Sequence, residues 1–294
     1  MLGRLGDAWK RIDNMRIAVL LTCYNRRQST ILCLTCLGKQ ELPPKTNIAT
    51  YLVDDGCTDG TALAVSERFP GVRIVTGDGT LYWCGGMRRA WAEAMPANYD
   101  AYLWLNDDTL LVPAALKTLT AAYESVTALG KAGIIVGSTC DPETGQLSYG
   151  GLRGRQRVLP GAGLEDCETM NGNIVLVPRE VCAAVGNLSA DFRQSAGDFD
   201  YGLRARKAGF GVWVAPGFLG QCRRNGLAPW RNPAVPFRAR WRNLHHPTGQ
   251  PPREWSIFNR RHYRFRWPTA MLSLYLCVLV PGLWLHLRRA ARRG

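Results

Sequence analysis

The stretch AYLWLNDD, residues 101–108, carries the pattern that decides the fold. Its first five residues are apolar, and Asn106, Asp107 and Asp108 follow them directly. A short apolar run without alternation is typical of a strand that is covered on both faces, as in a parallel sheet between helical layers. We therefore predict a buried strand that delivers polar side chains to the edge of such a sheet.

Short apolar strands and helices continue on both sides of this stretch. Strands are predicted over residues 16–23, 48–53, 72–75, 101–105 and 173–177. Helices are predicted over residues 27–37, 61–68, 86–95, 113–129 and 198–208. Strands that alternate with helices predict an α/β fold with a mainly parallel, twisted sheet that is flanked by helices.

Polar side chains follow the predicted strands at the points where they end. Thr22 and Asn25 come at the end of the first strand, and Asp54 and Asp55 at the end of the second. In parallel sheets the ligand crevice lies outside the carboxyl ends of the strands. These residues and the acidic run at 106–108 are therefore expected to line one site.

The acidic run at 106–108 has two interpretations. Adjacent carboxylates repel each other unless a cation or water compensates them, and Mg²⁺ binds one or two carboxylates together with substrate phosphates. The alternative is a turn in which an aspartate caps the next helix. The segment 54–61, DDGCTDGT, is also acidic. Asp54 is suited to accept hydrogen bonds from a nucleobase or ribose, whereas an Asx turn or a helix cap is favoured for Asp59.

A third acidic segment, GDFDYGLR at 197–204, opens a predicted helix. A carboxylate near a helix N-terminus is held ionised, so Asp198 is suited to take a proton from a hydroxyl group. Simple helix capping by Asp198 is the competing interpretation, and Asp200 is the second candidate for the base. Arg204 and Arg206 are expected to be surface or ion-pair residues.

The charge of the chain is unevenly distributed. Residues 1–220 hold 22 basic and 22 acidic side chains, whereas residues 221–294 hold fifteen arginines and one acid, so the whole excess of +14 lies in the last 74 residues. A basic end on a neutral body predicts an anionic partner for that end. A hydrophobic content of 46% excludes a mainly disordered chain. The ten cysteines show no disulfide or zinc-finger spacing, so we expect reduced packing cysteines in a cytosolic protein without a secretory signal.

The basic end also carries the longest apolar run of the chain. RRHYRFRW at 260–267 precedes apolar residues 268–287, which Pro281 and Gly282 interrupt and which four further arginines follow. Arginines on both flanks favour a monotopic helix or a re-entrant pair on an anionic cytoplasmic leaflet over a true span. A core helix and a nucleic-acid site are the other interpretations, and both are less favoured. A lipid-pyrophosphate-linked glycan would suit both the arginines, with Arg260 and Arg261 on the acceptor, and the apolar run.

Four segments together resemble glycosyltransferase family 2, whose members are inverting enzymes of the GT-A fold. They are LTCYNR at 21–26, VDDGCTDGT at 53–61, LNDD at 105–108 and GDFDYGLR at 197–204, and they cover roughly residues 16–220. GTLYWCGGMR at 79–88 resembles the donor-side loop of bacterial rhamnosyltransferase-like members, which suggests dTDP-L-rhamnose. MNGN at 170–173 resembles the acceptor-side segment, in which amides bind sugar hydroxyls.

The resemblance assigns roles to individual residues. It implies that Asp108 holds Mg²⁺ or Mn²⁺ at the donor diphosphate, and that Asp198 or Asp200 is the catalytic base. It places nucleotide and donor binding at Thr22, Tyr24, Asn25, Arg26, Asp54, Asp55, Asp59, Trp83, Gly85, Gly86, Arg88, Asn106 and Asp107. It places acceptor binding at Asn171, Gly172 and Asn173. A buried Trp83 is the alternative for the aromatic residue of the donor-side loop.

Two positions depart from the family pattern. Asn106 stands where the metal-binding triplet usually begins with aspartate, and Gly197 stands in the first place of the usual acidic pair. These departures keep a catalytically inactive, membrane-docked nucleotide- or carbohydrate-binding protein as an alternative. A sugar-phosphate nucleotidyltransferase is a second alternative, but residues 24–27 lack the glycines of its phosphate loop.

The sequence as a whole predicts an inverting glycosyltransferase. We expect it to move a sugar from a nucleoside-diphosphate sugar to a hydroxyl of a lipid-linked or cell-surface glycan, with a divalent metal and an anionic membrane as partners and no nucleic acid. The expected organisation is an extension over residues 1–15, a catalytic domain over 16–220 and a basic, membrane-associating region over 221–294. The expected location is the cytoplasmic face of the cell membrane.

Overall fold

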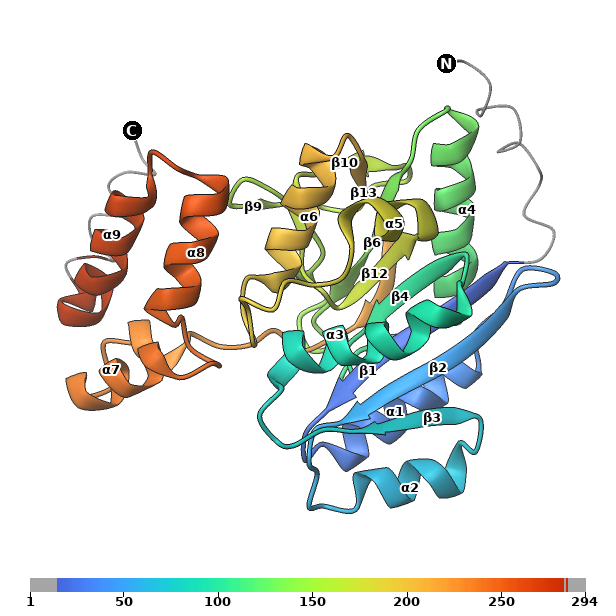
Figure 1. The fold of residues 1–294 in the computed structure, drawn as a ribbon, viewed down its shortest axis with the longest axis horizontal. Coiled ribbons are helices and arrows are strands. Elements are labelled where there is room, and N and C mark those ends of the chain that lie inside the picture. Colours follow the sequence, from blue (N-terminus) through green and yellow to red (C-terminus); the bar gives the residue numbers. More distant parts are fainter. Residues whose placement is uncertain (1–14, 283, 285–294) are drawn as a thin grey trace.

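Within residues 15–282 and 284, which the computed structural model describes, a ten-stranded sheet lies between two layers of helices (Figure 1). The strands that build this sheet are β1 (Arg16–Cys23), β2 (Asn47–Asp54), β3 (Val72–Thr76), β4 (Ala101–Leu105), β5 (Leu110–Leu111), β6 (Gly133–Cys140), β7 (Leu147–Tyr149), β10 (Glu165–Asp166), β12 (Ile174–Pro178) and β13 (Gly211–Gln221). A small second sheet is made of β8 (Gly151–Arg153), β9 (Gln156–Arg157) and β11 (Thr169–Met170).

The order of the main sheet is β10-β13-β6-β12-β4-β1-β2-β3, with β5 paired to β13 and β7 to β6. Strands β3, β2, β1 and β4 are parallel neighbours, and β13 is parallel to β6. Strand β12 is antiparallel to both β4 and β6. The predicted mainly parallel α/β sheet is confirmed, and the antiparallel β12 marks the boundary between its two parallel parts.

The helices cover the sheet on both faces because consecutive strand residues point to opposite sides. In β1, Ile17, Val19 and Leu21 pack towards the layer of α1, α2 and α4, whereas Ala18 and Leu20 pack towards the layer of α3, α5 and α6. The helices of the two layers are α1 (Arg27–Gly38), α2 (Thr61–Arg68), α3 (Tyr82–Ala94), α4 (Ala115–Ala128), α5 (Arg179–Val185) and α6 (Gly197–Lys207).

Helix α3 corrects one expectation. It begins at Tyr82 and not at residue 86, so the expected donor-side loop over 79–88 is helical from Tyr82 onwards. Gly85 and Gly86 are buried in its first turns. A Cβ atom on Gly86 would overlap Thr22 Oγ1. The absence of a side chain at Gly86 therefore lets α3 pack directly on β1.

The C-terminal part forms a helical arm beside α6 (Figure 1). Its helices are α7 (Phe237–His245), α8 (Pro252–His262) and α9 (Trp267–Leu279). A small apolar core of their own joins Trp230, Leu244, Leu274, Cys277 and Val278. None of the helices within the described part of the chain is long and apolar enough to span a bilayer. Residues 1–14 and 285–294, with the last four arginines, lie outside the described residues.

Candidate active site

The first two strand ends meet as the sequence predicts. Cys23 of β1 pairs in register with Asp54 of β2. Beyond β1, Asn25 adopts a left-handed conformation with φ of 49°. Its Oδ1 accepts a hydrogen bond from the backbone N–H of Thr58 at 2.7 Å, so it holds the loop that follows β2. Tyr24 beside it is exposed, and Thr22 faces α3.

The third strand end joins this cluster through Arg26. The Arg26 guanidinium forms ion pairs with Asp107, at 3.1 Å between Nη1 and Oδ1, and with Asp108. Asp107 is only 4% exposed and also contacts Thr30 Oγ1 at 3.4 Å. Burial raises the pKa of Asp107 to about 7, against the opposing effect of Arg26. Asp107 therefore points into the protein, and Asp108 is the carboxylate that reaches outwards.

Asp108 lines an open pocket of about 500 Å³. Arg26, Arg223 and Arg224 also line this pocket, which makes it basic. Mg²⁺ and Mn²⁺ are bound through one or two carboxylates plus substrate phosphates. Asp108 fits such a single-carboxylate site, and the Arg26 guanidinium already occupies a cation position on the acidic pair.

Trp83 connects the donor-side and acceptor-side segments. Its indole Nε1 donates a hydrogen bond of 2.6 Å to Asn106 Oδ1. A Cβ atom on Gly172 would overlap the same indole ring, so glycine is required there for the contact. The backbone N–H of Asn106 donates to the carbonyl of Asn173 at 3.1 Å. The side-chain oxygen of Asn106 is thus engaged by Trp83.

The acidic loop after β2 is organised by its own carboxylates. Asp54 Oδ1 accepts a hydrogen bond of 2.8 Å from the backbone N–H of Cys57. Asp59 accepts from the backbone N–H groups of Arg27 at 2.9 Å and Thr61 at 3.1 Å. Hydrogen bonds from Thr61 and Arg27 also lower the pKa of Asp59. Asp59 therefore makes the expected Asx-type contact and ties the starts of α1 and α2 together.

Asp55 has a structural task that the sequence did not reveal. Its buried carboxylate accepts backbone N–H groups from Gly79 at 2.9 Å, Leu81 at 3.3 Å and Tyr82 at 3.0 Å. Tyr82 has a φ of 55°, a conformation that favours glycine. Three hydrogen bonds to one carboxylate hold this strained entry into α3 in place.

Asp198 lies at the start of α6. Its Oδ1 accepts from the backbone N–H of Phe199 at 2.8 Å, and its Oδ2 accepts from the N–H of Gly172 at 3.1 Å. Burial raises the pKa of Asp198 to about 6, while these two hydrogen bonds oppose the rise. A carboxylate with this pKa is ionised at neutral pH and is still a better proton acceptor than an ordinary aspartate.

Asp200 has no exposed surface and is fully paired. Arg204 Nε lies 2.8 Å from Oδ2, whereas Arg261 Nη1 and His262 Nε2 each lie 2.8 Å from Oδ1. Burial alone would raise the pKa of Asp200, but the hydrogen bonds from His262, Arg261 and Arg204 hold it below its ordinary value. The residue joins α6 to α8 as the centre of a buried ion cluster.

The glycine that precedes Asp198 has a packing reason. A Cβ atom on Gly197 would overlap Cys84 Sγ, on the first turn of α3. A glutamate cannot occupy this position unless Cys84 moves. The sequence departure therefore reflects close packing between α3 and α6.

The expected acceptor residues have different surroundings. Asn173 is buried and its amide contacts Thr109 Oγ1 at 3.4 Å. Asn171 is half-buried beside the second sheet, where its N–H donates to the carbonyl of Gly150. Arg261 is paired with Asp200 and Asp191, and the Arg260 guanidinium lies 4.3 Å from the ring centroid of Trp267. Arg261 thus ties α8 to α6, and Arg260 packs on Trp267 within the arm.

Sequence reasoning missed the contacts between α8 and the donor side. Glu254 Oε1 accepts from Arg193 Nε at 3.0 Å. The carbonyl of Arg193 accepts the backbone N–H groups of Cys84 at 2.8 Å and Gly85 at 3.2 Å. Arg88 of α3 donates to the carbonyl of Ser189 in the same loop at 3.4 Å. The sequence held one signal for these contacts, because Glu254 is the one acidic residue among the last 74.

Comparison with known proteins identifies the family. The model of the family described as "Glycosyltransferase like family 2" matches residues 15–267. A search of curated protein sequences found no match.

Solved structures share the fold at low sequence identity. A mannosyltransferase from Pyrobaculum calidifontis, PcManGT in complex with GDP-Man and Mn²⁺, has a TM-score of 0.57 and 18% identity, over 95% of this chain and 76% of that one. TarS from S. aureus has a TM-score of 0.55 and 14% identity over 85% of this chain. Residues 1–349 of TarS with UDP have a TM-score of 0.56 and 16% identity, over 88% of this chain and 75% of that one. This chain spans 44% of the TarS structure, less than half its length.

Proposed function

The chain belongs to the glycosyltransferase-like family 2, and we propose that it is an inverting glycosyltransferase. It transfers a sugar from a nucleoside-diphosphate sugar to a hydroxyl group of a glycan acceptor. The observation that carries the proposal is the carboxylate of Asp198, held by two backbone N–H groups at the start of α6 with a pKa of about 6.

In this proposal Asp198 is the catalytic base. The acceptor hydroxyl donates its proton to the Asp198 carboxylate as its oxygen attacks the anomeric carbon. The nucleoside diphosphate leaves from the opposite side, which inverts the configuration. Asp200 is unsuited to this task because Arg204, Arg261 and His262 occupy both of its oxygens.

The donor nucleotide is proposed to bind along the ends of β1, β2 and β4. Asp54 accepts hydrogen bonds from the base or the ribose, and Arg224 and Asp108 face the diphosphate in the basic pocket. A divalent ion at Asp108, with Mg²⁺ and Mn²⁺ as the candidates, would neutralise charge on the leaving diphosphate. Two of the structural neighbours were solved with GDP-Man and Mn²⁺ or with UDP, which supports a nucleotide ligand for this fold.

The donor and acceptor are proposed from the sequence pattern. The segment 79–88 favours dTDP-L-rhamnose as the donor, and a lipid-linked or cell-surface glycan is the proposed acceptor. Trp83 of this segment donates a hydrogen bond to Asn106, which follows β4, and its ring packs on Gly172 of the proposed acceptor segment. The ring therefore lies between the end of β4 and the proposed acceptor segment.

Attachment to an anionic membrane surface is proposed for the arm. Helix α9 exposes Leu272, Leu276 and Leu279 at helical spacing, and Val280 at its C-terminal end is exposed as well. Phe265, before the helix, is 92% exposed. Arginines around these residues suit the cytoplasmic leaflet. We expect a truncation after Arg266 to abolish binding to phosphatidylglycerol vesicles, while the rest of the protein stays folded. If the truncated protein still sediments with vesicles, the attachment lies elsewhere.

Turnover tests the enzymatic proposal. We expect nucleoside diphosphate to be released from one donor of a panel of UDP-, GDP- and dTDP-sugars with Mn²⁺ and an acceptor extract, and Asp198→Asn to abolish the release. The alternative of an inactive binding protein predicts nucleotide binding without release from any donor. Asp108→Asn should remove the Mn²⁺-dependent part of nucleotide binding, as measured by thermal shift.

A further inference from the structure

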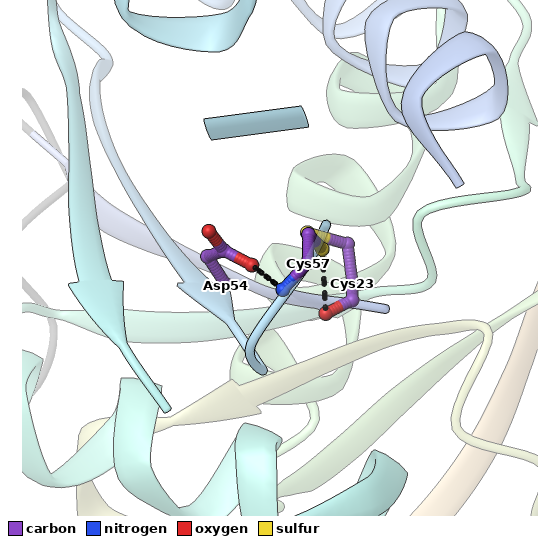
Figure 2. Close-up of side chains that lie close together, drawn as sticks. All are labelled: Cys23, Asp54 and Cys57. Atoms are coloured by element: carbon purple, nitrogen blue, oxygen red, sulfur yellow. Dashed lines mark hydrogen bonds between the residues drawn. The ribbon is translucent and has the colours of Figure 1, made fainter. Parts of the chain in front are cut away.

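Two cysteines and an aspartate lie close together at the ends of β1 and β2. Figure 2 shows the side chains of Cys23, Asp54 and Cys57 turned towards one another. Their ligand atoms all lie within 4.8 Å of one another, and no other group of three such ligands occurs among the residues that the structure describes. All ten cysteines lie within the described ranges, and none of them forms a disulfide there. Most of them pack singly in the core, so this pair is an exception to the expectation of packing cysteines.

The distance between the two sulfurs suits one tetrahedral ion. Cys23 Sγ and Cys57 Sγ are 3.8 Å apart. Two thiolates that bind one zinc ion at about 2.3 Å with a tetrahedral angle lie about 3.8 Å from each other. A disulfide requires a separation of about 2.05 Å, so the two sulfurs would have to move towards each other to form one. The observed arrangement needs no such movement to accept an ion.

The backbone also holds the cluster in a form that is ready to bind. Gly56, in the left-handed conformation with φ of 73°, turns the chain between Asp54 and Cys57. The N–H of Cys57 donates to Asp54 Oδ1 at 2.8 Å, and the N–H of Asn25 donates to Cys57 Sγ at 3.2 Å. Hydrogen bonds of this kind orient metal ligands and stabilise the negative charge on a thiolate. Two ligands three residues apart, with a third from the neighbouring strand, match the spacing of zinc sites.

The ligand chemistry selects the type of ion. Thiolates favour zinc and other thiophilic ions, whereas Mg²⁺ and Ca²⁺ prefer oxygen ligands. Both cysteines are thiols in the absence of an ion. Binding of one Zn²⁺ therefore forms two Zn–S bonds and one Zn–O bond and releases two protons to solvent. Three protein ligands leave a fourth position for water.

We propose that Cys23, Asp54 and Cys57 form a zinc-binding site, and that zinc and the donor nucleotide exclude each other. The exclusion rests on the proposed function, in which the Asp54 carboxylate contacts the base or ribose. One oxygen of Asp54 is held by the Cys57 N–H, so zinc and the nucleotide compete for the other. Zinc at this position acts as an inhibitor of donor binding, separate from the ion proposed at Asp108.

Cobalt(II) absorption tests the site without any need for activity. The reduced, metal-free full-length protein is titrated with Co²⁺, which gives a thiolate-to-metal charge-transfer band when cysteines coordinate it. We expect a band that saturates at one equivalent and disappears on addition of Zn²⁺. Cys57→Ser should remove the band and weaken Zn²⁺ binding by more than about 10-fold, since even outer contacts of metal ligands contribute about 10- to 100-fold.

Cys36→Ser is the matched control, because Cys36 is also half-buried and free but lies on α1 outside the cluster. It should leave the band unchanged, and circular dichroism should verify the fold of each variant. Absence of the band in the unaltered protein, or its persistence in Cys57→Ser, would overturn the zinc site.

A second measurement separates the site from the proposed function. Titration calorimetry with UDP, GDP and dTDP, with and without one equivalent of Zn²⁺, should show at least about 10-fold weaker nucleotide binding in the presence of Zn²⁺. This loss should be absent in Cys57→Ser. If Zn²⁺ binds the cluster but nucleotide affinity is unchanged, the exclusion is wrong. If no nucleotide binds even without Zn²⁺, the proposed function fails while the cobalt result still decides the zinc site.

Discussion

Replacement of Asp198 by asparagine should have opposite effects on activity and stability. Burial raises the pKa of Asp198 from 3.8 to about 6. At about 1.36 kcal/mol per pKa unit, the ionised carboxylate destabilises the folded state by about 3 kcal/mol above pH 6. Because the folded pKa is the higher one, the stability that protonated Asp198 provides is present below pH 4 and is lost as the pH rises through 6. Asparagine carries no charge and does not suffer this loss.

The asparagine changes the hydrogen bonds as well. The side-chain oxygen of the asparagine can still accept from the N–H of Phe199. Its NH₂ group then faces the N–H of Gly172, and two donors cannot form a hydrogen bond. Loss of that hydrogen bond costs about 0.5–1.5 kcal/mol at every pH. The net stabilisation by Asp198→Asn is therefore about 2 kcal/mol at pH 8, and the variant is about 1 kcal/mol less stable than the original protein at pH 4.

The assay for this prediction combines unfolding and turnover. Urea unfolding at pH 4, 6 and 8 gives the difference in free energy of unfolding, and its change with pH isolates the charge from the hydrogen bond. The rate of nucleoside diphosphate release should fall about 100- to 10,000-fold. In the original protein kcat/KM should decrease as the pH falls through about 6. A variant that keeps its activity, or whose relative stability does not change between pH 4 and 8, would refute the role of Asp198.

Three further predictions concern neighbouring contacts. Asp200→Asn should destabilise the protein by about 1–3 kcal/mol at pH 7, because Arg204 and Arg261 lose their buried carboxylate but remain partly exposed and keep other partners. Urea unfolding measures this, and an unchanged midpoint would contradict the ion cluster. Trp83→Phe should raise the donor KM several-fold and lower the free energy of unfolding by about 1 kcal/mol, since the hydrogen bond to Asn106 is lost. A donor KM equal to that of the original protein would show that this contact is dispensable. Leu272→Glu combined with Leu276→Glu should reduce sedimentation with anionic vesicles and leave donor hydrolysis intact. Full retention on the vesicles would argue against α9 as the attachment surface.

The strands and the placement of the strand-end residues could be read from the sequence. Ala101–Leu105 is uniformly buried, as its lack of alternation predicted, because both faces of β4 are covered. The register of β1 and β2 then brings Cys23 level with Asp54. Local composition decides such features, because a short apolar run that ends in polar residues is typical of a strand covered on both faces.

The features that escaped sequence analysis depend on contacts between distant residues. Helix α3 begins at Tyr82 because Asp55, 27 positions earlier, accepts its backbone N–H. The choice between Asp198 and Asp200 depends on Arg261 and His262, which lie more than 60 positions away. Neither partner follows from periodicity or motif spacing. The packing of α8 on α6 adds Arg261 and His262 to the pair that Asp200 already makes with Arg204 on α6, so both oxygens of Asp200 are occupied and Asp198 is left available.

Helix α8 connects the two halves of the proposed site. At one end Glu254 holds Arg193, whose carbonyl accepts the first N–H groups of α3 on the donor side. At the other end Arg261 and His262 hold Asp200, on the same helix as Asp198. A truncation at residue 255 would therefore remove the charges that buried Asp200 requires, and it would disturb the site as well as the arm. A cut after Arg266 removes α9, with three residues of the arm's own core, but keeps Arg261 and His262 of α8 on Asp200, so it tests membrane attachment without removing these charges.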